Sequence, residues 1–147
     1  MNLIENLQKE LCEYLISMMP VKWEKICFYS KCTSGSRTTW IALLEKETGA
    51  ICTQESFWDR YNEYPCKKID SYIRLGKLIE KLYNAYVEKF GEDKVWCTYF
   101  LTIDDDYTFH VDLGYEMLKG NIVEQHDAVV EKFFNTKYKY LEGKYPY

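Results

Sequence analysis

The spacing of apolar residues changes abruptly near the start of the chain. Between about residues 2 and 18 they recur every three to four positions, which predicts an amphipathic helix. Pro20 ends this helix, because proline lacks the backbone N–H that a helix needs. From about Trp23 to Cys32 the pattern changes to a period of two, with Ile26, Phe28 and Ser30 on one face, and this predicts a strand.

Four further segments have the composition or alternation of strands. The cluster at residues 33–36 is turn chemistry, so the strands on either side of it are expected to pair as an antiparallel hairpin. Asp104-Asp105-Asp106 predicts a second hairpin turn. The predicted strands after the first are Thr38 to Glu45, a short one from Ala50 to Thr53, Val95 to Ile103, and Tyr107 to Leu113.

Two more helices follow from the pattern. Tyr72 to Phe90 carries the strongest helical stripe, and Ile122 to Phe134 a shorter one. Ser56 to Ser71 has no clear period and is predicted to be a loop with at most one helical turn. The order α-β-β-(β)-α-β-β-α indicates an α+β fold, with an antiparallel sheet of about four to five strands packed against helices. Residues 1–147 are expected to form one domain.

Composition narrows the class of protein. Hydrophobic residues make up 47% and charged residues 29% of 147 positions, which is typical of a folded domain. The net charge of −4 argues against a sequence-independent nucleic-acid binder, which needs a basic face. Charges interrupt the N-terminal helix, and no apolar run is long enough to cross a membrane. We therefore expect a cytoplasmic protein whose six cysteines are reduced.

The candidates for chemistry are few. His110 lies on the polar face of its predicted strand, where a general base is conceivable but a solvated side chain is favoured, and His126 is expected to be exposed on its helix. The cysteines form no Cys-x-x-Cys pair, so a structural zinc site is not indicated. Cys12 and Cys97 lie on apolar stripes, where a free thiol behaves as a small hydrophobe.

The acidic run at residues 104–106 allows two interpretations. An EF-hand loop beginning there would need glycine at its sixth position, where Phe109 or His110 stands, so a solvated turn is favoured over a metal site. The functional alternative is an acidic rim that attracts a basic partner. Phosphate-binding glycine loops are also missing. The residues therefore indicate no catalytic, cofactor-binding or metal-binding site.

Several blocks resemble one family. They are Pro20-Val21-Lys22-Trp23-Glu24-Lys25-Ile26, Cys27-Phe28-Tyr29-Ser30, Leu101-Thr102-Ile103-Asp104, Phe109-His110-Val111-Asp112-Leu113-Gly114-Tyr115, and Lys137-Tyr138-Lys139-Tyr140-Leu141-Glu142-Gly143. Together they are similar, in order, to the YezG-like immunity (antitoxin) family of small bacterial proteins. The resemblance implies binding to a cognate secreted toxin, expected to be a nuclease, without catalysis, a cofactor, nucleic acid or a membrane. Trp23 is expected to pack in the core, outside the binding site.

The sequence departs from the family pattern in two places. The turn at Asp104 to Asp106 lacks the expected glycine, and Gln54 to Lys68 is unusually aromatic. Such segments are where partner specificity is expected to lie. In most protein interfaces a few buried anchor residues, surrounded by a polar rim, contribute most of the binding free energy. The predicted partner-binding residues are Trp58, Tyr61, Asp105, Asp106, Asp112 and Glu116.

Two other functions stay open. One is a small thiol- or histidine-dependent enzyme that uses Cys27 or His110, which would require a thiol of depressed pKa. The other is an adaptor module that binds a peptide along an exposed sheet edge.

Overall fold

The fold is described from a computed structural model of the chain. The structure describes residues 2–33, 35–54, 57, 61, 68–116 and 119–134. Trp58 and the block from Lys137 to Gly143 lie outside these residues, as does most of the segment from Gln54 to Lys68.

The first helix forms as its pattern predicts. α1 (Leu3–Ser17) begins at Asn2, whose side chain accepts a hydrogen bond of 2.8 Å from the Glu5 N–H and so caps the first turn. Leu7, Leu11 and Leu15 lie one helical turn apart and are buried. Each such leucine removed from water contributes about 2 kcal/mol, so this face holds α1 against the rest of the molecule.

A five-stranded antiparallel sheet forms the centre of the molecule. Its strand order is β3-β2-β1-β4-β5, so β1 is central and pairs with both β2 and β4. The predicted α+β class is confirmed, including the short strand that was expected after the first hairpin. The strands are β1 (Trp23–Cys32), β2 (Arg37–Glu45), β3 (Ile51–Thr53), β4 (Thr98–Asp104) and β5 (Phe109–Gly114).

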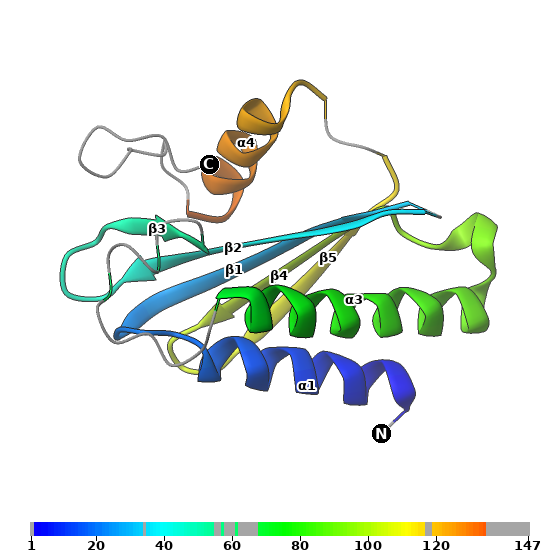
Figure 1. The fold of residues 1–147 in the computed structure, drawn as a ribbon, viewed down its shortest axis with the longest axis horizontal. Helices are drawn as coiled ribbons and strands as arrows, with labels where there is room; N and C mark the ends of the chain where they lie inside the picture. Colours follow the sequence, from blue (N-terminus) through cyan, green and yellow to red (C-terminus); the bar gives the residue numbers. More distant parts are fainter. Residues whose placement is uncertain are drawn as a thin grey trace.

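Helices cover both faces of this sheet (Figure 1). α1 and α3 (Lys68–Phe90) lie side by side on one face, where Phe28, Leu43 and Leu101 join their core. α4 (Ile122–Phe134) lies on the other face, over a second core that includes Tyr29 and Phe100. Because helices cover both faces of the central strands, consecutive residues in the middle of β1 and β2 are buried, whichever face they point to.

Three predicted boundaries were wrong. α3 starts at Lys68 within the predicted loop, because the exposed Ile69 and Asp70 of its first turn carry no apolar stripe. β4 starts at Thr98, after a short 3₁₀ helix (Glu92–Lys94), and not at Val95. β5 starts at Phe109, because Tyr107 belongs to the turn.

His126 is buried, and its predicted exposure was wrong. Its side chain is 7% exposed, and its ring stacks on Trp40 with centroids 4.7 Å apart. The polar neighbours of His126 suggested a solvated helix face. The structure instead turns the residue toward the second core, where Tyr29 meets it edge-on.

Candidate partner-binding surface

The turn between β4 and β5 has a defined hydrogen-bond pattern. The Asp104 N–H donates to the Thr108 carbonyl (2.8 Å), and the Tyr107 N–H donates to the Asp104 carbonyl (2.9 Å). The Asp106 carboxylate accepts from the Thr108 N–H (2.9 Å). This hydrogen-bonding lowers the pKa of Asp106. The pattern is that of a hairpin turn with a bulge, whose last position requires a left-handed backbone.

Tyr107 occupies that left-handed position. Its φ is +66°, and it is the one non-glycine residue of the described chain with positive φ. Glycine is the usual residue there, because a Cβ makes this conformation unfavourable by about 1–2 kcal/mol. The glycine that the sequence lacks at this turn is therefore replaced by a large aromatic side chain, which is 66% exposed.

Trp23 supports the Tyr107 ring from the neighbouring end of β1. The two rings meet edge to face, with centroids 6.0 Å apart and planes at 81°. A bulge between Trp23 and Lys25 shifts the β1–β2 register, so that Trp23 lies opposite Glu45. This places the indole on the face covered by α1 and α3, where it is only partly buried. Trp23 was expected to pack in the core, and it packs against the core under α1 and α3, while its ring also lies beside Tyr107, the most exposed described aromatic residue.

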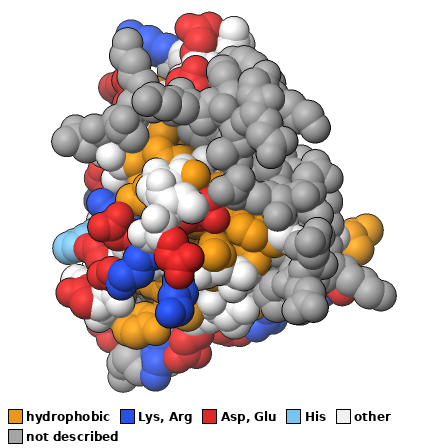
Figure 2. Space-filling model, turned by 90° about the vertical axis from the view of Figure 1, so that its left-hand side faces the viewer, with side chains coloured by type: hydrophobic (Ala, Val, Ile, Leu, Met, Phe, Trp, Pro, Cys, Tyr) orange, Lys and Arg blue, Asp and Glu red, His pale blue; other side chains and the backbone are white. Residues whose placement is uncertain are grey.

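A cleft of about 520 Å³ opens beside this pair. Charged side chains surround it, and Lys46 Nζ lies 3.1 Å from Asp105 Oδ2. The space-filling view of this end of the sheet shows acidic, basic and hydrophobic side chains interleaved (Figure 2). An apolar centre within a charged rim is the composition of protein interfaces. The described residues that line the cleft are Lys22, Trp23, Lys46, Glu47, Asp105 and Tyr107.

The acidic residues continue along β5. Residues 98–116 contain five carboxylates and no lysine or arginine. Lysines reach them only from other elements: Lys25 Nζ lies 3.9 Å from Asp104 Oδ1, and Lys132 Nζ lies 2.6 Å from Asp112 Oδ2. Lys46 pairs with Asp105 in the same way, so among the described residues Asp106 and Glu116 are the carboxylates of this hairpin without a lysine partner, and they are the ones that can attract a basic partner.

Exposed aromatic residues follow the same hairpin. Phe109, the first residue of β5, is 47% exposed, and Tyr115, the residue after the strand, is 64% exposed, so an aromatic ring is in contact with solvent near each end of β5. Large exposed aromatic side chains are frequent anchors of interfaces. We name this surface the β5 hairpin surface; its described residues are Trp23, Asp105, Asp106, Tyr107, Phe109, Asp112, Tyr115 and Glu116.

Four of the six predicted partner-binding residues lie on the β5 hairpin surface. Asp105 and Asp106 are exposed in the turn, Asp112 is exposed on β5, and Glu116 is exposed just beyond it. The aromatic residues of this surface were not among the predicted partner-binding residues. The sequence features that could have indicated them are Tyr107 in place of the expected turn glycine, and Phe109 and Tyr115 near the two ends of one short strand.

The predicted anchor Tyr61 lies elsewhere. Its hydroxyl donates to Glu45 Oε2 at 3.1 Å and approaches Cys52 Sγ at 3.3 Å, between β2 and β3. Burial raises its pKa well above the usual range, and the nearby Cys52 and Glu45 raise it further. Tyr61 is thus partly buried against the sheet, while Trp58 lies outside the described residues.

Four of the described cysteines, Cys12, Cys27, Cys32 and Cys52, are buried and serve as packing groups. Cys27 is fully buried, and burial raises its pKa far above the usual range, while burial raises the pKa of Cys12 to about 11. Such thiols are poor nucleophiles near neutral pH. His110 is exposed, and its Nε2 lies 3.8 Å from Asp104 Oδ2. In the part of the chain that the structure describes, no group of three or more His, Cys, Asp or Glu is arranged to hold a metal ion.

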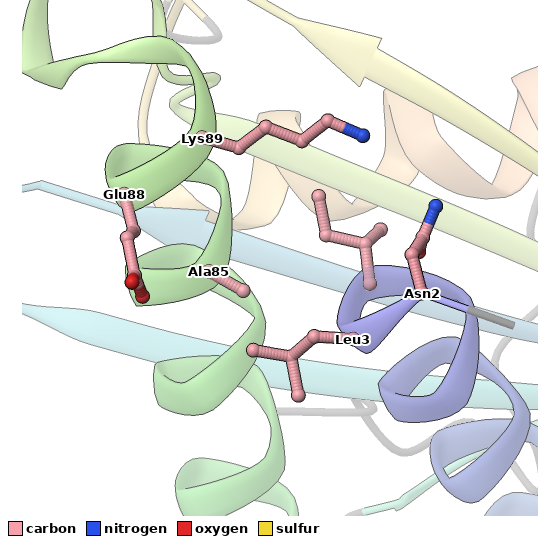
Figure 3. Close-up of a pocket in the computed structure, with 6 residues that line it drawn as sticks. Asn2, Leu3, Ala85, Glu88 and Lys89 are labelled. Atoms are coloured by element: carbon pink, nitrogen blue, oxygen red, sulfur yellow. The ribbon is translucent and has the colours of Figure 1, made fainter.

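A second cavity offers less chemistry. A groove of about 410 Å³ lies between the start of α1 and the end of α3 (Figure 3). Leu3 and Ala85 face it, with Glu88 and Lys89 at its side. One carboxylate and one ammonium at the rim of a small apolar groove do not converge on a ligand.

Among the described residues, no helix is long and apolar enough to span a membrane.

Comparison with known proteins agrees with the blocks noted in the sequence. A search among curated proteins found no match. A family model described as immunity protein YezG-like matches residues 4–146. Because this match spans nearly the whole chain, the chain belongs to the YezG-like immunity protein family.

Proposed function

We propose that this protein works in the cytoplasm as an antitoxin, which binds a cognate secreted toxin with nuclease activity and neutralises it stoichiometrically. Membership of an immunity protein family supports binding to a toxin. The observation that supports a basic toxin such as a nuclease is the β5 hairpin surface, where exposed aromatic rings and carboxylates occur on one hairpin.

The charge of this surface supports a nuclease partner. A nuclease neutralises the phosphates of its substrate with lysine and arginine side chains, so its active face is basic. The carboxylates at 105, 106, 112 and 116 are suited to occupy such a face in place of phosphates. Tyr107 and Phe109 supply the apolar area that makes such a contact persist.

Co-expression tests the proposal. If a toxin with a nuclease-like domain is encoded beside this gene, cells that produce it are expected to survive only when this protein is also present, and their DNA or RNA to stay intact. The variant Asp105→Lys with Asp106→Lys is expected to weaken protection. The matched control, Glu88→Lys, places a positive charge at the groove between the ends of α1 and α3 and is expected to protect fully. Loss of protection without nucleic-acid damage would point to a toxin of another class.

The adaptor alternative draws on one specific observation. β5 is an exposed edge strand, and edge strands accept peptides as additional strands. Peptide binding by the isolated protein, without any effect on a toxin, would favour the adaptor function.

A further inference from the structure

The two edges of the sheet differ in exposure. β3, at one edge, has three residues, all of them buried. β5, at the other edge, has six residues, and none of them is buried. No described strand lies beyond β5. An exposed edge presents unpaired backbone groups that template another strand.

The hydrogen-bond pattern between β4 and β5 identifies which backbone groups of β5 point away from the sheet. In an antiparallel pair, alternate residues direct both N–H and C=O toward the neighbouring strand. The Asp104 N–H bonds to the Thr108 carbonyl, and the Cys97 N–H bonds to the Gly114 carbonyl. With the register Thr102↔His110, the even-numbered residues of β5 therefore bond to β4. Phe109, Val111 and Leu113 direct their N–H and C=O groups away from the sheet.

The side chains along this edge separate into two rows. Val111 and Leu113 pack against the core under α1 and α3, and Phe109 extends that row into solvent. His110 and Asp112 project on the opposite face and are exposed. A strand added to β5 would therefore meet an apolar row on one face, His110 and the Lys132-paired Asp112 on the other face, and exposed carboxylates near both ends of β5.

We propose that the toxin binds as a sixth strand of this sheet, contributing an extended segment with lysine or arginine side chains that pairs with β5. The inference rests on the proposed function, since it names the contact through which the toxin is held. Charge complementarity identifies the occupant: the hairpin carries five carboxylates and no lysine or arginine, and among the described residues Asp106 and Glu116, near its two ends, have no lysine partner. A basic strand therefore fits this edge better than a second copy of the same hairpin, which would bring like charges together.

Amide hydrogen exchange of the full protein tests the pairing directly. In the free protein the amides of Phe109, Val111 and Leu113 are expected to exchange faster than those of His110 and Asp112. Adding the toxin domain against which this protein protects cells in the co-expression test is expected to slow the three outward amides at least about tenfold. The same alternation, visible before and after binding, separates strand addition from contact through side chains alone.

A pair of variants supports this measurement. Val111→Pro removes one outward N–H, and proline is tolerated in edge strands at positions whose N–H faces solvent. It is expected to weaken toxin binding about tenfold relative to Val111→Ala, which also shortens the side chain that packs on the core but keeps the N–H. Because the exchange experiment uses the unaltered chain, poor folding of Val111→Pro would not remove the test.

The outcomes distinguish the two proposals. Toxin binding with unchanged exchange at Phe109, Val111 and Leu113 would overturn strand addition and leave the antitoxin function standing. Protection of these amides without toxin, rising with protein concentration in parallel with a dimer seen by sedimentation, would assign the edge to a second copy. Failure of the unaltered protein to bind the toxin would overturn both.

Discussion

The rings of Trp23 and Tyr107 stand almost perpendicular, with centroids 6.0 Å apart, and join the start of β1 to the turn between β4 and β5. An edge-to-face pair of this kind contributes about 0.5–1.5 kcal/mol beyond its buried area. The left-handed backbone of Tyr107 costs a similar amount. The two effects nearly cancel, so this turn can keep an exposed aromatic ring without a large loss of stability.

Substitutions at Tyr107 are expected to separate strain from ring contact. Tyr107→Gly and Tyr107→Ala both remove the ring, but only glycine relieves the positive φ. The free energy of unfolding, measured with urea, is expected to be about 1 kcal/mol higher for the glycine variant than for the alanine variant. Both variants are expected to bind toxin more weakly than the unaltered protein. Equal stability of the two would show that the turn relaxes to accommodate a Cβ.

Neutralising the turn carboxylates is expected to slow association. The double variant Asp105→Asn with Asp106→Asn leaves Lys46 without its partner and weakens the negative field that steers a basic toxin. The association rate constant at low salt is expected to fall roughly three- to tenfold, with little change in dissociation. Stopped-flow measurements over a range of salt concentrations check this, with Glu88→Gln as the control. A salt dependence that matches the unaltered protein would contradict acidic steering.

Two glycines are expected to respond oppositely to alanine. A Cβ on Gly114 would lie 2.0 Å from Thr98 Oγ1, so Gly114→Ala must displace β5 or Thr98 and is expected to destabilise by about 1–3 kcal/mol. Thr98→Ala in the same chain is expected to recover part of that loss. At Gly76, within α3, a Cβ would meet nothing within 4 Å. Gly76→Ala is therefore expected to stabilise the protein by about 0.5–1 kcal/mol in thermal unfolding.

Cys12 is expected to make stability fall at high pH. Burial, followed by the negative charge of Glu13, raises its pKa from 9.0 to about 11. The unfolded chain then loses this proton before the folded protein does. The associated stability is therefore present below pH 9 and is lost between pH 9 and 11, by roughly 3 kcal/mol. Urea unfolding at several pH values checks this, and Cys12→Ala is expected to show a shallower decline over the same range.

Local patterns were enough to predict most of the secondary structure. The α1 stripe and the alternation in β1 depend on residues close together in the sequence, and both elements formed where expected. The pairing of β1 with β4 was not predictable, because it joins segments separated by β2, β3 and α3. The position of α4 on the opposite face of the sheet has the same origin, and it explains why His126 is buried.

The candidate surface was predictable only in part. Its carboxylates stand out in the sequence because a run of three aspartates is conspicuous. Trp23 joins the surface through a bulge that moves its side chain to the other face of the sheet. Tyr107 depends on a left-handed backbone that residue preferences disfavour. Both are departures from regular geometry, which periodicity cannot reveal.

The central β1–β4 pairing also joins two consecutive pieces of the chain, an N-terminal piece and a C-terminal piece. α1 and the first three strands come from residues before 54, and α3, β4, β5 and α4 come from residues after 67. The pieces meet along seven residue pairs, from Lys25↔Asp104 to Lys31↔Thr98, and where α1 packs on α3. Each piece alone would expose half of one hydrophobic core and one side of a strand ladder. A chain cut between residues 54 and 67 is therefore expected to yield two fragments that fold only on each other, as separately expressed halves would reveal by reassembling.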